Sequence, residues 1–216
     1  MIRTGCDILA SEDCARLSGL RTGVLSNPAS VDAGLRHVID IVGGSYARLA
    51  CLFGPQHGLM GDTQANMIEW RGYIHPRLGI PVHSLYGDSR EPDAAVLEKL
   101  DAVVIDLPDI GARPYTYLWT AALMMRACAA TGTKVVVLDR PCPIGGARVE
   151  GPILDMAYAS FVGLHPLPMR HGLTIGEALR LINASGAARC ELEIVEMEGW
   201  ARGMYFGDTG LPWVLP

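Results

Sequence analysis

The sequence lacks the long apolar runs and the clustered basic residues that mark two large classes of protein. No stretch reaches the 18 or so consecutive apolar residues of a membrane-spanning helix, so no span is expected. The 18 Lys and Arg are scattered and outnumbered by 23 Asp and Glu, which argues against nucleic-acid binding. The first twenty residues lack the apolar centre of a signal peptide. We therefore expect a cytoplasmic protein, or a periplasmic or secreted one if the true N-terminus is missing.

Several chemical motifs are also missing. The six cysteines form no CxxC pair and show no zinc-like spacing with histidine, so we expect buried, reduced thiols and no metal. There is no GxSxG nucleophile elbow, no GxxxxGK[ST] phosphate loop and no GxGxxG fingerprint. An enzyme that uses a dinucleotide or a nucleoside triphosphate is therefore disfavoured, and no cofactor is predicted.

What is present is a large apolar fraction. Half of the 216 residues are hydrophobic and only 19% are charged, which is enough to bury a sizeable core. The length predicts one large domain, or one domain and part of a second. We place a catalytic domain at residues 1–190 and the start of a truncated C-terminal domain at residues 191–216. The final segment, "DTGLPWVLP", contains two prolines and is a poor end for a packed element.

Short apolar runs alternate with helical patterns along the chain. Strands are predicted within 22–30 (followed by a loop at Asn27), 48–54, 80–87, 101–109, 134–141 and, as an edge strand, 190–198. Helices are predicted at 8–20, 32–44, 93–100, 115–131 and 174–185. This alternation indicates a Rossmann-like three-layer α/β domain with a mostly parallel sheet. Ligands of such sheets bind beyond the carboxyl ends of the strands.

Polar side chains gather at those predicted strand ends. The loop "GPQHGLMGD" after the second strand holds an amide, an imidazole and a carboxylate between glycines. In chain order the candidate site residues are Asn27, Gln56, His57, Asp62, Asp106, Asp109, Arg113, Tyr115, Tyr117, Arg140, Glu150, Arg170 and His171. Carboxylates, arginines, histidines and tyrosines around one cleft suit a polyhydroxylated, anionic ligand, because arginine binds carboxylates bidentately and tyrosine stacks on sugar faces.

Each of these side chains also has a purely structural interpretation. His57 is able to hydrogen-bond a carbonyl within its own turn, and Tyr115 and Tyr117 are able to serve as packing residues. Glu177 has the spacing to cap its own helix with Thr174. The remaining alternatives are helix caps for Asp106 and Asp109, and a loop-bracing ion pair for Asp139 and Arg140.

Seven segments in order resemble one family. They are "LFGPQHGLMGD", "PVHSLYG", "VVIDLPDIGARPYTY", "VVLDRPCPIGG", "VEGPIL", "FVGLHPLPMRHGLTIGE" and "DTGLPWV". From about residue 22 to the end the chain resembles the NamZ-type exo-β-N-acetylmuramidases. The resemblance implies a Rossmann-like amino-terminal domain, a smaller C-terminal domain and an active site between them. It also implies release of N-acetylmuramic acid from the non-reducing end of peptidoglycan fragments during cell-wall recycling.

The chain departs from the family pattern in three respects. Gln56 stands where the family usually has glutamate, Cys142 stands where asparagine is common, and family members continue well beyond "GLPWV". Glycosidases generally use two carboxyl groups, and glutamine is unable to donate the required proton. The remaining candidate carboxyls are Glu150, Asp106, Asp109 and Asp62. We predict that partial burial raises the pKa of Glu150 for an acid role.

These observations predict a glycoside hydrolase for muramic-acid-containing glycans. His57 is expected to orient the acid or the substrate. We expect one arginine to bind the lactyl carboxylate of the sugar, the candidates being Arg113, Arg140 and Arg170. We expect Tyr115 and Tyr117 to bind the apolar face of the sugar. An alternative is a catalytically impaired muropeptide- or sugar-binding domain, because of Gln56 and the truncation. A third is a nucleotide- or phosphate-binding regulatory domain, which the layered fold alone suggests.

Overall fold

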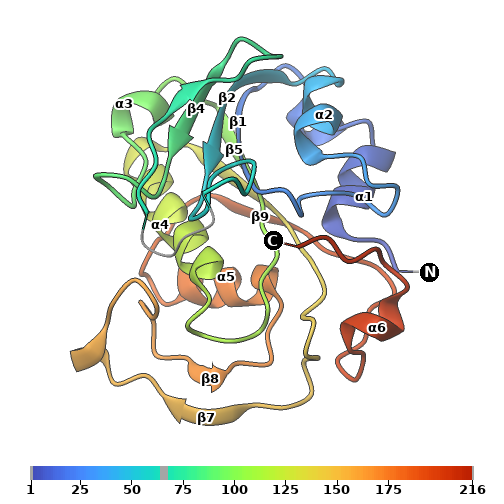
Figure 1. Cartoon of the computed structure of the whole chain (residues 1–216), viewed down its shortest axis with the longest axis vertical. Helices are drawn as coiled ribbons and strands as arrows, with labels where there is room; N and C mark the ends of the chain where they lie inside the picture. Colours follow the sequence, from blue (N-terminus) through green and yellow to red (C-terminus); the bar gives the residue numbers. More distant parts are fainter. Residues whose placement is uncertain (1, 64–67, 216) are drawn as a thin grey trace.

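The protein is built on one seven-stranded sheet (Figure 1), seen in a computed structural model that describes residues 2–63 and 68–215. The order across the sheet is β3-β4-β2-β1-β5-β6-β9, and only β3 runs antiparallel to its neighbour. The strands are β1 (Arg21–Ser26), β2 (Arg48–Gly54), β3 (Tyr73–Ile74), β4 (Pro81–Ser84), β5 (Ala102–Asp106), β6 (Lys134–Leu138) and β9 (Leu192–Val195).

The strand order changes direction between β1 and β5, which are neighbours in the sheet. From β1 it proceeds to β2 and β4 on one side, and then returns to β5, β6 and β9 on the other. Parallel pairing sets Ser26 beside Asp106, so the ends of β1 and β5 lie together. This is the topological switch point, where a crevice opens in doubly wound sheets.

Helices cover both faces of the sheet, giving the predicted three layers. On one face lie α1 (Gly5–Ser11) and α2 (Val38–Gly43). On the other lie α3 (Ala94–Leu97), α4 (Thr116–Thr131) and α5 (Ile175–Ala184). Successive side chains of the strands enter opposite layers: Val103 and Ile105 pack toward α4, whereas Val104 packs toward α1 and α2. Because both faces are covered, the central strands read as continuous apolar runs.

Two helices show how local sequence sets their ends. α4 ends at Gly132, which adopts φ 73°, a conformation that costs glycine little. α5 begins at the N-cap Thr174, whose hydroxyl accepts from the Glu177 backbone N–H while the Glu177 carboxylate accepts from the Thr174 N–H. This capping box confirms the structural interpretation of Glu177.

A long excursion leaves the sheet after β6. It contains a two-stranded antiparallel ribbon, β7 (Glu150–Ile153) and β8 (Pro168–Arg170), which the sequence patterns do not predict. The short helix η2 (Met156–Tyr158) lies between them. After β9 the chain forms α6 (Phe206–Thr209), and the C-terminal segment 210–215 then runs back across the molecule (Figure 1).

The predicted fold class is confirmed, with shifted boundaries. The first helix begins at Gly5 rather than residue 8, and η1 (Ala15–Leu17) follows it as a separate turn. Residues 32–37 of the second predicted helix form a loop before α2. The strand β9 is an edge strand, as expected, but it joins the main sheet although it lies beyond residue 190. The division into domains at residue 190 stays a prediction, and its outermost residues, 1 and 216, lie outside the described residues.

Candidate functional site

The loop after β2 is held in one shape by close packing. A side chain at Gly54 would have its Cβ 2.7 Å from the Leu59 nitrogen and 2.7 Å from the Trp70 ring, so only glycine fits there. The Trp70 indole N–H donates to the Pro55 carbonyl at 3.1 Å. Gly58 adopts φ 85°, which lets the chain turn back after His57. The sequence therefore builds a rigid platform for Gln56 and His57.

His57 itself has an unusual backbone conformation. Its φ of 71° lies in the left-handed region, which is sparsely populated by residues other than glycine. Such conformations cost about 1–3 kcal/mol and are concentrated at functional sites. The Nδ1 atom lies 2.8 Å from the Thr63 carbonyl, which only accepts, so Nδ1 carries the proton. Nε2 has no hydrogen-bond partner among the described residues and, in the neutral ring, is an acceptor.

The start of α4 faces this loop. The Thr116 hydroxyl donates to Gln56 Oε1 at 3.0 Å, so the Gln56 side chain lies at the first turn of the helix. The rings of Tyr115 and Tyr117 meet edge to face, 4.9 Å between centroids. Burial raises the pKa of both phenols; at Tyr117, hydrogen bonds with Asn27 and Tyr115 partly offset this effect. Both tyrosines therefore stay neutral, as hydrogen-bonding and stacking groups.

These side chains line one open cleft of about 700 Å³. Such a volume lies within the range of about 300–1,000 Å³ for small-molecule sites. Four of the predicted site residues meet here: Gln56, His57, Tyr115 and Tyr117. The other lining residues are Tyr86, Arg90, Pro114, Thr116, Ser160, Phe161 and Val162. Among the described lining residues there is no aspartate or glutamate, so the cleft offers aromatic faces, amide and hydroxyl groups, an imidazole and a guanidinium.

A second group of predicted residues lies at the switch point and is engaged internally. Asp106 is fully buried, and its two carboxylate oxygens accept from Arg140, with Nη2 to Oδ2 at 2.8 Å. Arg140 Nη2 also donates to the Val31 carbonyl at 2.9 Å. This paired carboxylate keeps the pKa of Arg140 high despite the opposing effect of burial. The pair uses both groups, and neither lines the open cleft.

Asp139 has a different partner from the one predicted. Its carboxylate accepts from the Thr174 hydroxyl at 2.9 Å and from the Gly176 N–H at 2.8 Å, at the start of α5. Burial raises its pKa to about 6, although these hydrogen bonds oppose the shift. The Asp139–Arg140 side-chain ion pair, considered as a structural alternative, does not form, because each side chain binds an element distant in the sequence.

Asp109 and His171 form a second buried pair. Asp109 Oδ2 accepts from the Gly111 N–H at 2.9 Å and lies 3.2 Å from His171 Nε2. The latter contact does not have hydrogen-bond geometry. Neither aspartate proposed as a cap of α4 caps it, because Tyr115 is the N-cap and no side chain accepts there.

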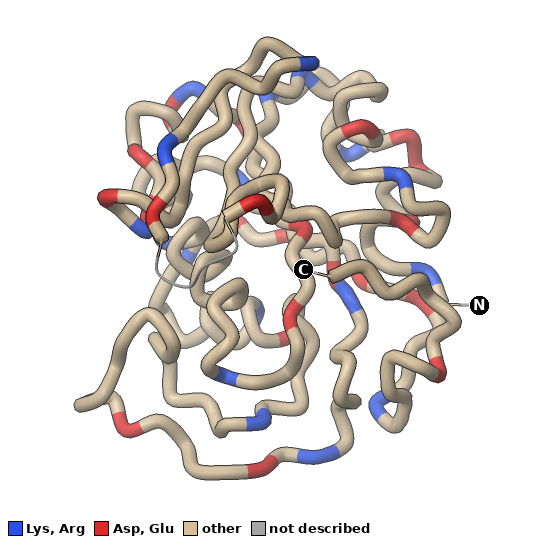
Figure 2. The backbone as a smooth tube through the Cα atoms, viewed as in Figure 1, with Lys and Arg blue, Asp and Glu red and all other residues tan. Residues whose placement is uncertain are grey.

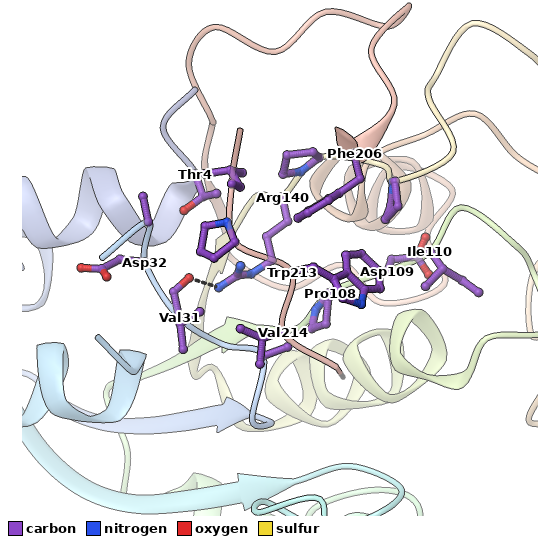
Figure 3. Close-up of a pocket in the computed structure, with 16 residues that line it drawn as sticks. Thr4, Val31, Asp32, Pro108, Asp109, Ile110, Arg140, Phe206, Trp213 and Val214 are labelled. Atoms are coloured by element: carbon purple, nitrogen blue, oxygen red, sulfur yellow. Dashed lines mark hydrogen bonds between the residues drawn. The ribbon is translucent and has the colours of Figure 1, made fainter. Parts of the chain in front are cut away.

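The switch point is covered by the end of the described chain. Figure 3 shows Trp213 and Val214 over Arg140 and Pro108, with Phe206 beside them. The rings of Phe206 and Trp213 meet edge to face at 4.7 Å. The space left beneath them has a volume of only about 50 Å³. That space is too small for a sugar, so the usual crevice of this fold is filled by the protein's own side chains.

Glu150 and Arg170 lie on the ribbon, where they pair with each other. The two are opposite residues of β7 and β8, and Arg170 Nη1 donates to Glu150 Oε2 at 2.7 Å. Glu150 is exposed, and the Arg170 guanidinium lowers its pKa. The expectation of a buried Glu150 with a raised pKa is therefore wrong. Glu150 is the first residue of a strand and does not line the cleft.

Arg113 and Asp62 are also not among the residues that line the cleft. Arg113 Nη1 donates to the carbonyls of Pro152 and Leu167, at 2.9 and 2.6 Å, and so ties the ribbon to the loop after β5. Asp62 is exposed, and its charge contributes to a raised pKa at Tyr73. Asn27 is buried behind Tyr117, where its Oδ1 accepts from the Ala29 N–H at 3.1 Å.

Several cleft residues were missed by the sequence patterns. Tyr86 and Arg90 follow β4, so they obey the same rule that polar groups gather at the ends of strands. Phe161 and Val162 come from the excursion after β6. Nothing in "AYASFVG" indicates that this segment folds back so that Phe161 packs against Tyr86, in the loop after β4.

The charged side chains of the described residues are of mixed sign, a distribution that does not suit the binding of a polyanion. Figure 2 shows Lys and Arg interspersed with Asp and Glu over the whole tube.

Across residues 2–63 and 68–215, no three His, Cys, Asp or Glu side chains are placed to hold a metal ion. Within the same residues, no helix is both long and apolar enough to cross a bilayer. All six cysteines are free thiols, five of them buried.

Comparison with known families decides the relationship. The family model described as the N-terminal part of the exo-β-N-acetylmuramidase NamZ matches residues 22–216. The chain belongs to the NamZ N-terminal domain family. It is 44% identical over its whole length to the peptidoglycan β-N-acetylmuramidase NamZ of Bacillus subtilis (strain 168), of which it covers 52%.

Solved structures of relatives share the same fold. A DUF1343 family protein of Bacteroides fragilis NCTC 9343 superimposes with a TM-score of 0.91 at 38% identity, over 99% of this chain and 54% of its own. A second DUF1343 protein of that organism gives 0.81 at 30% identity, over 95% of this chain and 54% of its own. This NamZ-family chain thus spans about half the length of the relatives it matches.

Proposed function

We propose that the Gln56 cleft binds the terminal N-acetylmuramic acid of peptidoglycan fragments, and that the domain serves an exo-β-N-acetylmuramidase reaction. The observation that carries the proposal is the meeting of Gln56, His57, Tyr115 and Tyr117 in one open cavity of about 700 Å³. Aromatic rings suit the apolar face of a pyranose, and the imidazole, amide and hydroxyl groups suit its hydroxyls and acetamido group. The Bacillus subtilis relative, named for this activity, supports the substrate class.

One feature of the cleft favours binding over turnover in this chain. Glycoside hydrolysis uses carboxyl groups to protonate the leaving oxygen and to assist water or form an intermediate. The described lining contains none, and Gln56 occupies the position where the resemblance implies glutamate. A catalytically impaired sugar-binding domain is therefore the second candidate function.

Restoring a carboxyl at position 56 separates the two candidates. In Gln56→Glu the new carboxylate keeps the hydrogen bond from Thr116 and lies at the first turn of α4, where a negative charge is tolerated. We expect hydrolysis of an aryl β-N-acetylmuramide to rise by about 10²-fold or more, the typical contribution of a general acid or base. Gln56→Leu is the matched control, with no gain expected because it adds no titratable group.

Full turnover by the unaltered chain, with no gain in Gln56→Glu, would reject the impaired-domain candidate and place the acid elsewhere. Absence of turnover in both, together with binding of N-acetylmuramic acid in calorimetry, would leave binding as the function of these residues. Calorimetric binding of a nucleotide instead of the sugar would contradict the proposal altogether.

A further inference from the structure

Arg90 is the one lysine or arginine among the described residues that line the cleft. The three arginines expected to bind the lactyl carboxylate have other partners: Arg113 binds two carbonyls, Arg140 binds Asp106, and Arg170 binds Glu150. The cleft is therefore left with a single positive charge, whose ion-pair partner Glu69, 3.8 Å away, is not among the lining residues.

Two aromatic rings hold the Arg90 guanidinium in place. Its Cζ lies 3.7 Å from the centroid of the Tyr86 ring and 5.6 Å from that of Phe161. The two rings are themselves 6.0 Å apart, at an interplanar angle of 43°. Stacking of this kind fixes the plane of a guanidinium without using its hydrogen-bond donors. A guanidinium that is stacked in this way without a ligand loses less conformational entropy when a ligand binds.

The hydrogen bonds of Arg90 leave one edge unused. Nη1 donates to the Gly87 carbonyl at 2.8 Å, and the same atom lies 3.8 Å from Glu69. Nε and Nη2 have no hydrogen-bond partner among the described residues. Those two groups form the edge of a guanidinium that binds both oxygens of a carboxylate in parallel.

We propose that Arg90 binds the lactyl carboxylate of N-acetylmuramic acid through Nε and Nη2, and so selects this sugar over N-acetylglucosamine. The inference rests on the proposed function of the cleft, and it replaces the three arginines named from the sequence. N-acetylglucosamine has the same ring and acetamido group but no lactyl ether. N-acetylglucosamine offers no carboxylate to Nε and Nη2 of Arg90, so the acidic sugar is expected to bind more tightly.

Calorimetry with three methyl β-glycosides tests this proposal in the unaltered chain. The ligands are those of N-acetylmuramic acid, of its neutral methyl ester and of N-acetylglucosamine. We expect the acid to bind about 10–100-fold more tightly than the ester or N-acetylglucosamine, the usual gain from hydrogen bonds to a charged group. Changing the ligand rather than the protein keeps folding out of the comparison.

Variants then assign that preference to Arg90. In Arg90→Gln the acid is expected to bind no better than its ester, while affinity for N-acetylglucosamine is unchanged. Arg90→Lys keeps the charge but loses the planar edge, so it is expected to keep only part of the preference. Arg77→Gln, an exposed arginine that pairs with Asp40, is the matched control and should leave all three affinities unchanged.

The outcomes separate this inference from the function it rests on. Equal affinity of the unaltered chain for acid and ester, or an undiminished preference in Arg90→Gln, would overturn the role of Arg90 and leave the sugar site standing. Failure of all three glycosides to bind the unaltered chain would overturn the proposed function, and with it the inference.

Discussion

The two groups of polar residues at the carboxyl edge of the sheet differ in whether they are open to a ligand. At the switch point, Asp106 and Arg140 bind each other in a buried pair beneath the C-terminal segment. At the end of β2, uncharged and aromatic groups line an open cleft with one stacked arginine. In this molecule, the oppositely charged side chains at the switch point bind each other and are not available to a ligand. The groups that line the open cleft are held mainly by packing.

Removing one member of the buried pair gives the largest expected effect. Asp106→Asn leaves the Arg140 guanidinium buried without a counter-charge, and we expect the free energy of unfolding to fall by about 3–5 kcal/mol. Urea titration measures the loss. Asp40→Asn breaks an exposed pair with Arg77 and should cost under about 1 kcal/mol. If the two variants lost the same free energy of unfolding, the buried Asp106–Arg140 pair would contribute no more to stability than an exposed ion pair does.

An intermediate effect is expected for the aromatic wall of the cleft. Tyr115→Ala removes a ring that would cover the apolar face of the sugar, and we expect the Kd for N-acetylmuramic acid to rise about tenfold, or about 1.4 kcal/mol. Tyr115→Phe keeps the ring and should change the Kd by under about threefold. Tyr158→Ala, at a tyrosine that is 77% exposed on η2, controls for loss of an aromatic residue outside the cleft. Unchanged affinity in Tyr115→Ala would mean that the sugar does not bind against the start of α4.

The smallest effect concerns Asp139 and pH. Burial raises the folded pKa of Asp139 to about 6, above the ordinary aspartate value of 3.8, so the folded state binds the proton more readily than the unfolded chain. Between these two values, this group stabilises the fold as pH falls and loses that contribution as pH rises through 6. From pH 7 to pH 5 the unaltered chain should gain on the order of 1 kcal/mol relative to Asp139→Asn.

The measurement is the difference in unfolding free energy between the two proteins at each pH. Taking this difference removes the other carboxylates, which titrate in both proteins. A difference that stays constant between pH 7 and pH 5 would contradict the raised pKa, and would mean that the hydrogen bonds from Thr174 and Gly176 offset or outweigh the effect of burial.

Much of the fold is predictable because its signals are local. The apolar run at 134–138 becomes β6, the helix over 115–131 ends at its glycine, and Thr174 with Glu177 caps α5. Predictions fail where the partner is distant in sequence. Arg140 binds Asp106, 34 residues away, rather than its neighbour Asp139, and Glu150 is drawn to Arg170 by the pairing of two strands.

The residues of the candidate site also fall into two groups, those with a local sequence signal and those placed by contacts distant in the sequence. Gln56, His57, Tyr115 and Tyr117 are found from the sequence because each follows a strand or begins a helix at the predicted edge. The placement of Arg90 depends on Tyr86 nearby and on Phe161, which lies 71 residues further along the chain. No local pattern contains that contact, so the sequence does not single out Arg90.

A crystal structure of this chain soaked with N-acetylmuramic acid would show where the sugar binds. We expect the sugar in the cleft between His57 and Tyr115, with its carboxylate at Arg90 and no ligand beneath Trp213. A sugar bound instead at Asp109 and Arg140, with the C-terminal segment displaced, would contradict this expectation.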